Sequence, residues 1–217
     1  MLIGISGMIG SGKSVLSKKL VNHYKKNSLL LQEFSDDDEV FTTMLKWLYE
    51  RKPNFDATFQ VYVLEYHLGL VEKIKAKFKK REMDQNKDII FLDRFVAEHY
   101  VFATVNLKHC EEKIKKAYDS FFNCMVTKDN LPEYAIFLDV SFENFKERLF
   151  NRGRQVEIDS FDKNKKYFKN LLAIYKETFI KVAEKFGVKY QIIDTNGKSE
   201  LEVFHEAKMH IDNFMKG

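Results

Sequence analysis

The sequence predicts an α/β fold with a five-stranded parallel sheet and helices on both of its faces. Five short apolar runs recur along the chain, and their apolar residues are largely continuous rather than alternating with polar ones. Continuous runs are typical of strands that are buried on both faces of a parallel sheet. The longer segments between them repeat apolar residues with the helical period. Strands that alternate with helices favour a parallel sheet covered on both sides.

The expected elements follow one another in order along the chain. The apolar runs place strands at residues 2–6, 29–34, 89–93, 134–140 and 188–194. Helical spacing places helices at residues 59–78, 114–125, 168–186 and 201–214, and Leu16, Leu20 and Tyr24 indicate another after the first strand. Ligands of such sheets bind beyond the carboxyl ends of the strands, so the residues after each run are the first candidates for function.

Length and composition are those of one domain. The 217 residues contain no linker rich in proline, glycine or serine, so a single domain at residues 1–217 is expected. Lys and Arg exceed Asp and Glu by only four, which is too weak a bias to indicate a nucleic-acid polymer as partner. No leader pattern and no apolar stretch of membrane-spanning length is present, so a cytoplasmic location without a membrane partner is expected.

A glycine-rich motif follows the first expected strand and opens the first expected helix. Its sequence, GMIGSGKS, fits the P-loop pattern G-x-x-x-x-G-K-[ST] at residues 7–14. Backbone N–H groups and the start of the helix can surround a phosphate, while Lys13 reaches the β- and γ-phosphates and Ser14 binds Mg²⁺. The candidate phosphate-binding residues are Gly7, Met8, Ile9, Gly10, Ser11, Gly12, Lys13 and Ser14. The motif predicts a nucleoside triphosphate site.

Two charged residues, Asp93 and Arg94, follow the third expected strand. Parallel strand order sets them near the P-loop, where a carboxylate can hold Mg²⁺ and an arginine can bind a phosphoryl oxygen. A surface ion pair is the alternative interpretation.

Three arginines gather around Gly153 in the stretch RLFNRGRQVE. Arg148 and Arg152 are one helical turn apart and share a face, and Arg154 follows the glycine. Guanidinium groups suit phosphate oxygens, and such a segment can close over a transferred phosphoryl group. We expect an arginine-rich lid at about residues 148–160, with a solvated helix end as the alternative. The chain lacks the N-K-x-D signature of a typical GTPase.

Other polar residues suit an acceptor molecule. Glu33 stands at the carboxyl end of the second expected strand, where a carboxylate can take the proton of an attacking hydroxyl group or simply face solvent. Gln60 lies in a helix that is apolar on most faces, so its carboxamide is expected to be buried. A buried carboxamide needs both a donor and an acceptor, which either a nucleobase edge or a structural hydrogen bond can supply. The acidic run at residues 36–39 is more typical of a loop or a helix start than of a metal cluster.

Together these pieces resemble the deoxyribonucleoside kinases, which include deoxycytidine, deoxyguanosine and bacterial deoxyadenosine kinases. The similarity runs from the P-loop to the final strand. The P-loop is shared with many proteins, whereas the spaced set of LYERKP, FQVY, DR and RGRQVE is far more specific. The resemblance implies a P-loop kinase fold and transfer of the γ-phosphoryl group of ATP, with Mg²⁺, to the 5′-hydroxyl group of a deoxynucleoside in nucleotide salvage. It also implies a homodimer packed through helices.

At the acceptor end, the resemblance implies a role for each matching residue. Glu33 matches the general base for the 5′-hydroxyl group, and Gln60 matches the glutamine that pairs with the base. Tyr49 and Glu157 match the pair that holds the sugar 3′-hydroxyl group. Arg94 matches the arginine beside the 5′-oxygen and the transferred phosphate.

At the donor end, the resemblance implies that Asp93 is the acidic residue near Mg²⁺, beside the catalytic Lys13 of the P-loop. Arg148, Arg152 and Arg154 match lid arginines on the ATP phosphates. The adenine-contacting loop falls around residues 194–196 and begins with Asp194.

The chain departs from the family pattern near the base. His67 stands where many relatives carry an arginine, and His99 where many carry an aspartate. Phe95 replaces a small residue after Asp93-Arg94, and Phe34-Ser35 replace a proline and a small apolar residue after the glutamate. The base is therefore open, and a purine, in deoxyadenosine or deoxyguanosine, is favoured by similarity to the bacterial members.

Two other functions stay open at this point. A nucleoside monophosphate kinase of the thymidylate-kinase type shares the P-loop and the DR dipeptide, but it has less need of Glu33 or of the Tyr49 and Glu157 pair. In a non-catalytic nucleotide-binding switch, Glu33 and Gln60 would have no functional role.

Overall fold

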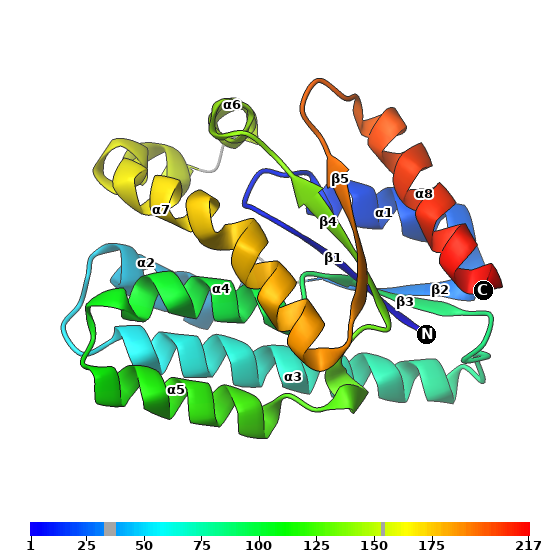
Figure 1. Cartoon of the computed structure of the whole chain (residues 1–217), viewed down its shortest axis with the longest axis horizontal. Helices are drawn as coiled ribbons and strands as arrows, with labels where there is room; N and C mark the ends of the chain where they lie inside the picture. The colour runs from blue at the N-terminus through cyan, green and yellow to red at the C-terminus, as the bar shows by residue number, and fades with distance from the viewer. Residues whose placement is uncertain (33–37, 153–154) are drawn as a thin grey trace.

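The structure is a computed structural model that describes residues 1–32, 38–152 and 155–217, without the side chains of residues 152, 155–157, 159 and 160. Within these ranges the strands form an all-parallel five-stranded sheet in the order β2-β3-β1-β4-β5 (Figure 1). They are β1 (Leu2–Gly7), β2 (Ser28–Leu31), β3 (Ile89–Asp93), β4 (Tyr134–Asp139) and β5 (Lys189–Asp194). The predicted sheet is confirmed.

Helices cover both faces of this sheet, as the sequence predicts. One face carries α1 (Lys13–Tyr24) and α8 (Glu200–Lys216), and the other carries α3 (Asp56–Lys80), α4 (Val96–Asn106), α5 (Glu112–Met125) and α7 (Gln155–Phe186) (Figure 1). The remaining elements are α2 (Glu39–Tyr49), α6 (Phe142–Arg152) and short 3₁₀ turns at Lys25–Asn27, Leu107–His109 and Lys128–Asn130. The larger apolar core lies between the sheet and the four-helix face, because that face supplies most of the buried aromatic rings.

Four elements differ from the expectations. Helix α7 begins at Gln155, well before the expected residue 168. Strand β2 ends at Leu31, which pairs with Leu92 of β3, and residues 33–34 of the expected strand lie outside the described residues. Helix α4 was not predicted from the sequence. Its first turns are buried on nearly every side, so its sequence has no polar face that repeats with the helical period. Helix α2 begins at Glu39, and the Asp38 carboxylate caps it by accepting a hydrogen bond from Phe41 N at 2.9 Å. The helix-start interpretation of the acidic run therefore holds for its described part.

The carboxyl ends of β1, β3 and β4 meet at one edge of the sheet. Ile5 is in register with Asp93 and Gly7 with Leu138, so the P-loop and the DR dipeptide emerge side by side. A Cβ atom at Gly7 would lie 2.5 Å from the Leu138 carbonyl oxygen, and this explains the need for glycine there. No helix in the described part of the chain is both long enough and apolar enough to pass through a membrane.

Phe95, which departs from the family pattern, fits because of a glycine on the neighbouring strand. Its side chain is fully buried and packs edge to face on Phe179 with 5.9 Å between ring centroids. A Cβ atom at Gly4 would come within 2.7 Å of the Phe95 ring. The absent side chain of Gly4 thus makes the room that Phe95 occupies.

Candidate active site

The P-loop connects β1 to the first turn of α1. Gly10 and Gly12 have φ values of 72° and 100°, a left-handed conformation that glycine adopts without strain. Lys13 opens the helix, and its buried ammonium group donates to the Gly7 carbonyl at 2.6 Å and to the Met8 carbonyl at 3.1 Å. The ammonium group therefore lies across the loop, where phosphate oxygens can replace the carbonyl oxygens as acceptors.

A cavity of about 1000 Å³ extends from this loop into the space between α2, α3 and α4. Most of the described candidate residues line it: Ile9, Gly10, Ser11, Gly12, Lys13, Ser14, Tyr49, Gln60, Asp93, Arg94, His99 and Arg148. Gly7, Met8, His67 and Asp194 do not. Glu33 and Arg154 lie outside the described residues, as do the side chains of Arg152 and Glu157.

Asp93 and Arg94 occupy the turn from β3 to α4, at the centre of the cavity wall. Asp93 is 6% exposed, and its Oδ1 has no hydrogen-bond partner among the residues described. Arg94 has a φ value of 85°, which is costly for a residue with a side chain and is typical of functional turns. Its backbone N–H donates to the Ile5 carbonyl at 3.0 Å, and its guanidinium group lies 5.1 Å from the centre of the Phe102 ring.

Gln60 lies on α3 with a side chain that is fully buried, as the sequence predicts. Neither its amide nitrogen nor its amide oxygen has a hydrogen-bond partner in the described part of the chain. Leaving such atoms unpaired in a protein interior costs about 1–3 kcal/mol. A ligand that forms hydrogen bonds with both atoms removes this cost. The amide is therefore a candidate contact for a polar, planar ligand.

Two buried histidines adjoin this amide end of the cavity. His67 and His99 are 2% and 3% exposed, and their ring centroids are 4.8 Å apart at an angle of 60°. Burial, followed by the charge of Arg94, lowers the pKa of His67 to about 4. Burial, His67 and Arg94 lower the pKa of His99 well below 6.5. Both rings are therefore neutral near pH 7, and each then carries one N–H donor and one acceptor nitrogen.

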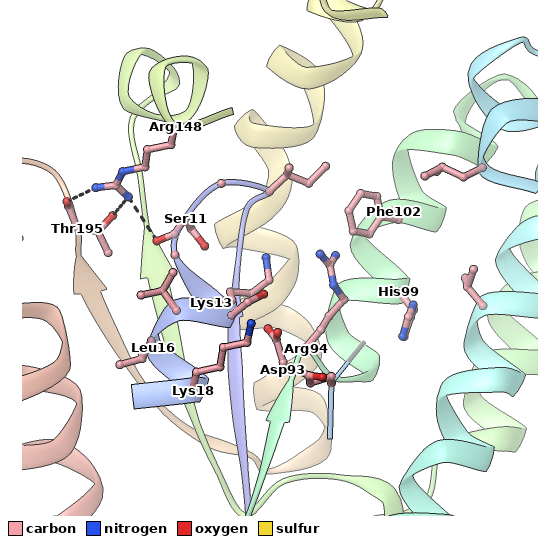
Figure 2. A pocket seen from close by; sticks show the side chains of 18 of the residues that line it. Ser11, Lys13, Leu16, Lys18, Asp93, Arg94, His99, Phe102, Arg148 and Thr195 are labelled. Carbon is pink, nitrogen blue, oxygen red and sulfur yellow. Dashed lines mark hydrogen bonds between the residues drawn. The ribbon is translucent and has the colours of Figure 1, made fainter. Parts of the chain in front are cut away.

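Arg148 connects α6 to the donor end of the cavity. It donates to Thr195 Oγ1 at 2.9 Å, to the Thr195 carbonyl at 2.8 Å and to the Ser11 carbonyl at 3.4 Å (Figure 2). Thr195 in turn donates from Oγ1 to the Asp139 carbonyl at 2.8 Å. The guanidinium group thus spans the P-loop and the loop after β5, and Figure 2 shows Lys13 and Arg94 across the same cavity.

The family follows from a comparison of the whole chain. A family model described as deoxynucleoside kinase matches residues 3–216. The chain belongs to the deoxynucleoside kinase family. The resemblance predicted from the motifs is thereby confirmed.

Two relatives match most of this deoxynucleoside kinase family member. An uncharacterised protein of Mycoplasma pneumoniae is 32% identical over 202 residues, which are 90% of this chain and 83% of that protein. A deoxyguanosine kinase of Lactobacillus johnsonii is 28% identical over 188 residues, which are 83% of this chain and 77% of that enzyme.

Solved structures share the fold. The structure of deoxyadenosine kinase from M. mycoides with bound dCTP has a TM-score of 0.72 at 20% identity, covering 98% of this chain and 100% of that chain. The structure of thymidylate kinase from Candida albicans has a TM-score of 0.67 at 16% identity, covering 98% of this chain and 91% of that chain.

Thr195 lines the cavity from within the predicted adenine-contacting loop at residues 194–196, whereas the Asp194 Oδ1 atom accepts from Asn196 N at 2.9 Å. Neither Tyr167 nor Glu98 was foreseen from the sequence as part of this cavity or its surroundings. Tyr167 lines it beside Tyr49, with 6.5 Å between ring centroids. Glu98 is fully buried and contacts both Arg94 and Lys13. Its position four residues after Arg94, in the first turn of α4, is a signal that could have identified it.

Proposed function

We propose that this chain transfers the γ-phosphoryl group of ATP to the 5′-hydroxyl group of a deoxynucleoside in nucleotide salvage, within one domain at residues 1–217. One observation carries the proposal: a continuous cavity joins the P-loop to the buried amide of Gln60. A phosphate donor at one end and a nucleoside at the other would meet beside Arg94, which lies between Lys13 and His99 in Figure 2. Family membership supports the same reaction.

At the donor end, the P-loop and Lys13 would hold the ATP phosphates, and Arg148 would leave the Thr195 carbonyl to bind them as well. The residues present also fit Mg²⁺, which prefers one or two protein oxygens together with substrate phosphates. Asp93 offers a buried carboxylate oxygen that no described residue pairs with, and the Ser14 hydroxyl group lines the cavity. Mg²⁺ bound there would neutralise charge on the transferred phosphoryl group.

At the acceptor end, the Gln60 amide would pair with the nucleobase and Tyr49 would contact the sugar. Arg94 would bind the phosphoryl group in transfer. Glu33 as general base and Glu157 as the second sugar contact rest on the resemblance alone. Phosphoryl transfer chiefly requires positioning and charge stabilisation, and these polar groups around the cavity would supply both.

For the nucleobase we propose a purine. The relatives named deoxyguanosine kinase and deoxyadenosine kinase support this choice. His99 lines the cavity near Gln60, with His67 packed behind it, and neutral rings can pair with the donor and acceptor atoms of a purine edge.

We also propose a homodimer packed through helices, by similarity to the family. Sedimentation equilibrium tests it: the expected mass is twice the 25.7 kDa of the chain. A mass of one chain at micromolar concentration would reject it.

The first experiment measures ADP release with ATP and Mg²⁺ against a matched panel. The panel holds the common deoxynucleosides, adenosine, guanosine and the corresponding monophosphates. Turnover of purine deoxynucleosides is expected, and Glu33→Gln should remove most of it because the amide cannot accept the hydroxyl proton. Glu72→Gln, on the exposed face of α3, makes the same charge change as a control.

The other outcomes of this panel are equally informative. Turnover of monophosphates alone would mean a kinase of the thymidylate-kinase type. ATP binding without turnover of any acceptor would mean a nucleotide-binding switch. Full activity of Glu33→Gln would reject Glu33 as the base.

A further inference from the structure

Glu98 is a buried carboxylate beside Lys13 and Arg94 of the proposed site, and no proposed role accounts for it. It lies on the first turn of α4, and its side chain has 0% exposure. Its Oε2 atom is 2.9 Å from Arg94 Nη1, 3.8 Å from Lys13 Nζ and 2.5 Å from the Tyr175 hydroxyl oxygen. The three donors come from three elements: the turn after β3, the start of α1 and the middle of α7.

Burying a carboxylate is costly unless cations and hydrogen bonds compensate for its lost hydration. Here the compensating cations are Lys13 and Arg94, the two that the proposed function assigns to the phosphates. When ATP binds, its phosphate oxygens would approach the same two cations. Glu98 and the triphosphate therefore compete for them.

Arg94 needs external support because of its backbone. Its φ value of 85° is a strained conformation that persists only where neighbouring groups hold it. Glu98 holds the guanidinium group by an ion pair, and the Phe102 ring packs 5.1 Å from it. An arginine fixed in this way needs no reorganisation when charge develops on a phosphoryl group.

Tyr175 contacts the same carboxylate oxygen as the two cations. Its ring is buried in the core between α7 and the sheet, 6.0 Å from the Phe102 ring, and its hydroxyl group donates to Glu98. Helix α7 thus reaches the Glu98 carboxylate, and through it the arginine.

We propose that Glu98 is a positioning residue of the phosphoryl-transfer site. Its carboxylate holds the Arg94 guanidinium group in the geometry for transfer, and it weakens ATP binding by competing for Lys13 and Arg94. The charge of Glu98 thereby raises kcat and lowers the affinity for ATP. This role rests on the proposed kinase function.

The test is Glu98→Gln, which keeps the shape and removes the charge. We expect kcat to fall by about tenfold or more, as is typical when one stabilising group is misplaced. We expect ATP to bind at least about threefold more tightly in calorimetry, because a buried negative charge beside Lys13 has been removed. A residue with a merely structural role would lower kcat without improving ATP affinity. Glu72→Gln serves as the charge-matched control and should leave both quantities unchanged.

Two further variants separate positioning from a general effect. In an Arg94→Lys background, Glu98→Gln should change kcat by less than about threefold, because coupled residues are not additive. Tyr175→Phe keeps the charge, so we expect an unchanged ATP affinity and a kcat lowered by about threefold, the usual effect of losing one hydrogen bond. If Glu98→Gln does not fold, Tyr175→Phe decides, and a wild-type kcat for it would overturn the proposal.

Several outcomes overturn the proposal outright. They are a kcat of Glu98→Gln equal to that of the wild type, unchanged or weaker ATP binding, and full additivity with Arg94→Lys. If the wild type binds ATP but phosphorylates no acceptor, the proposed function fails instead. Tighter ATP binding by Glu98→Gln would then still support the competition of Glu98 for the cations, and unchanged binding would reject it.

Discussion

At the scale of single residues, this protein keeps costly polar groups in its interior where a ligand would bind. Gln60, His67 and His99 are almost fully buried, and each has a side-chain atom without a hydrogen-bond partner in the described ranges. Interiors usually satisfy such atoms or exclude them. Gln60 and His99 line the cavity and His67 packs against His99, so ligand binding is the simplest reason for their presence.

Replacing Gln60 with Leu is expected to stabilise the protein while it removes activity. The substitution eliminates two unpaired buried polar atoms, so the free energy of unfolding should rise by about 1 kcal/mol. The kcat/KM for the deoxynucleoside should fall by about 100-fold, because leucine cannot form the hydrogen bonds that the Gln60 amide would make with the base.

Urea unfolding and steady-state kinetics measure the two effects of this change. The exposed Gln85, changed to Leu, provides the control and should alter neither. A loss of stability without loss of activity would show that Gln60 has a structural hydrogen bond instead.

The buried histidines predict a loss of stability in mild acid. Burial and the Arg94 charge lower the pKa of His67 from 6.5 to about 4, so in this range the unfolded chain binds a proton that the folded protein excludes. Stability should fall as the pH drops below about 6.5, by roughly 2 kcal/mol at about pH 5 from His67 alone. Thermal melts across this range measure it. His67→Gln should flatten the dependence, whereas His109→Gln, at an exposed site, should not.

At the scale of elements, one side chain joins the parts that would hold ATP. Arg148 on α6 binds both the P-loop carbonyl of Ser11 and the loop after β5 through Thr195. The predicted lid at about residues 148–160 begins within α6, so this contact links the first residue of that segment to the donor site.

Replacing Arg148 with Ala is expected to lower kcat/KM for ATP by about 10- to 100-fold, because a charge-assisted contact to phosphate is lost. Arg148→Lys should recover only part of this loss, since an ammonium group cannot span several acceptors as the guanidinium group does. Steady-state kinetics at varied ATP measure the effect. Lys181→Ala removes an exposed cation from α7 and should have wild-type kinetics. Equal kinetics for Arg148→Ala and wild type would refute the role.

At the scale of the whole molecule, the cavity lies where strands from the middle of the sheet end. β1 contributes the P-loop, β3 contributes Asp93 and Arg94, and β4 leads into α6. A ligand that fills the cavity contacts elements from both ends of the sequence. Binding should therefore stabilise the fold as a unit.

ATP with Mg²⁺ at about 100 times its Kd is expected to stabilise the protein by about 2.7 kcal/mol, provided that only the folded state binds. For a chain of this size that corresponds to a rise in Tm of roughly 5–10 °C. Differential scanning calorimetry measures the shift. Lys13→Met should lose most of it, and Lys80→Met, at the exposed end of α3, should retain it. A full shift in Lys13→Met would argue against binding at the P-loop.

Local sequence alone was enough for the fold class, and most of the described candidate residues line one cavity. Continuous apolar runs identify buried strands because both faces of a parallel strand are covered. The glycines of GMIGSGKS allow the backbone to curl around an anion, so the motif can be identified from its sequence. The burial of Gln60 also followed from its apolar neighbours. Helix α4 escaped prediction because burial on nearly every side removes the periodicity that reveals a helix.

The sequence by itself determined that this chain has a parallel α/β fold, a P-loop and a set of residues typical of deoxynucleoside kinases. Only the tertiary structure decided which of these residues share a cavity. It placed Thr195 rather than Asp194 beside Arg148, and it brought Glu98 to both Lys13 and Arg94. The physical reason is that a motif depends on local spacing along the chain. The role of a buried charge depends on its partners, which come from distant segments of the chain.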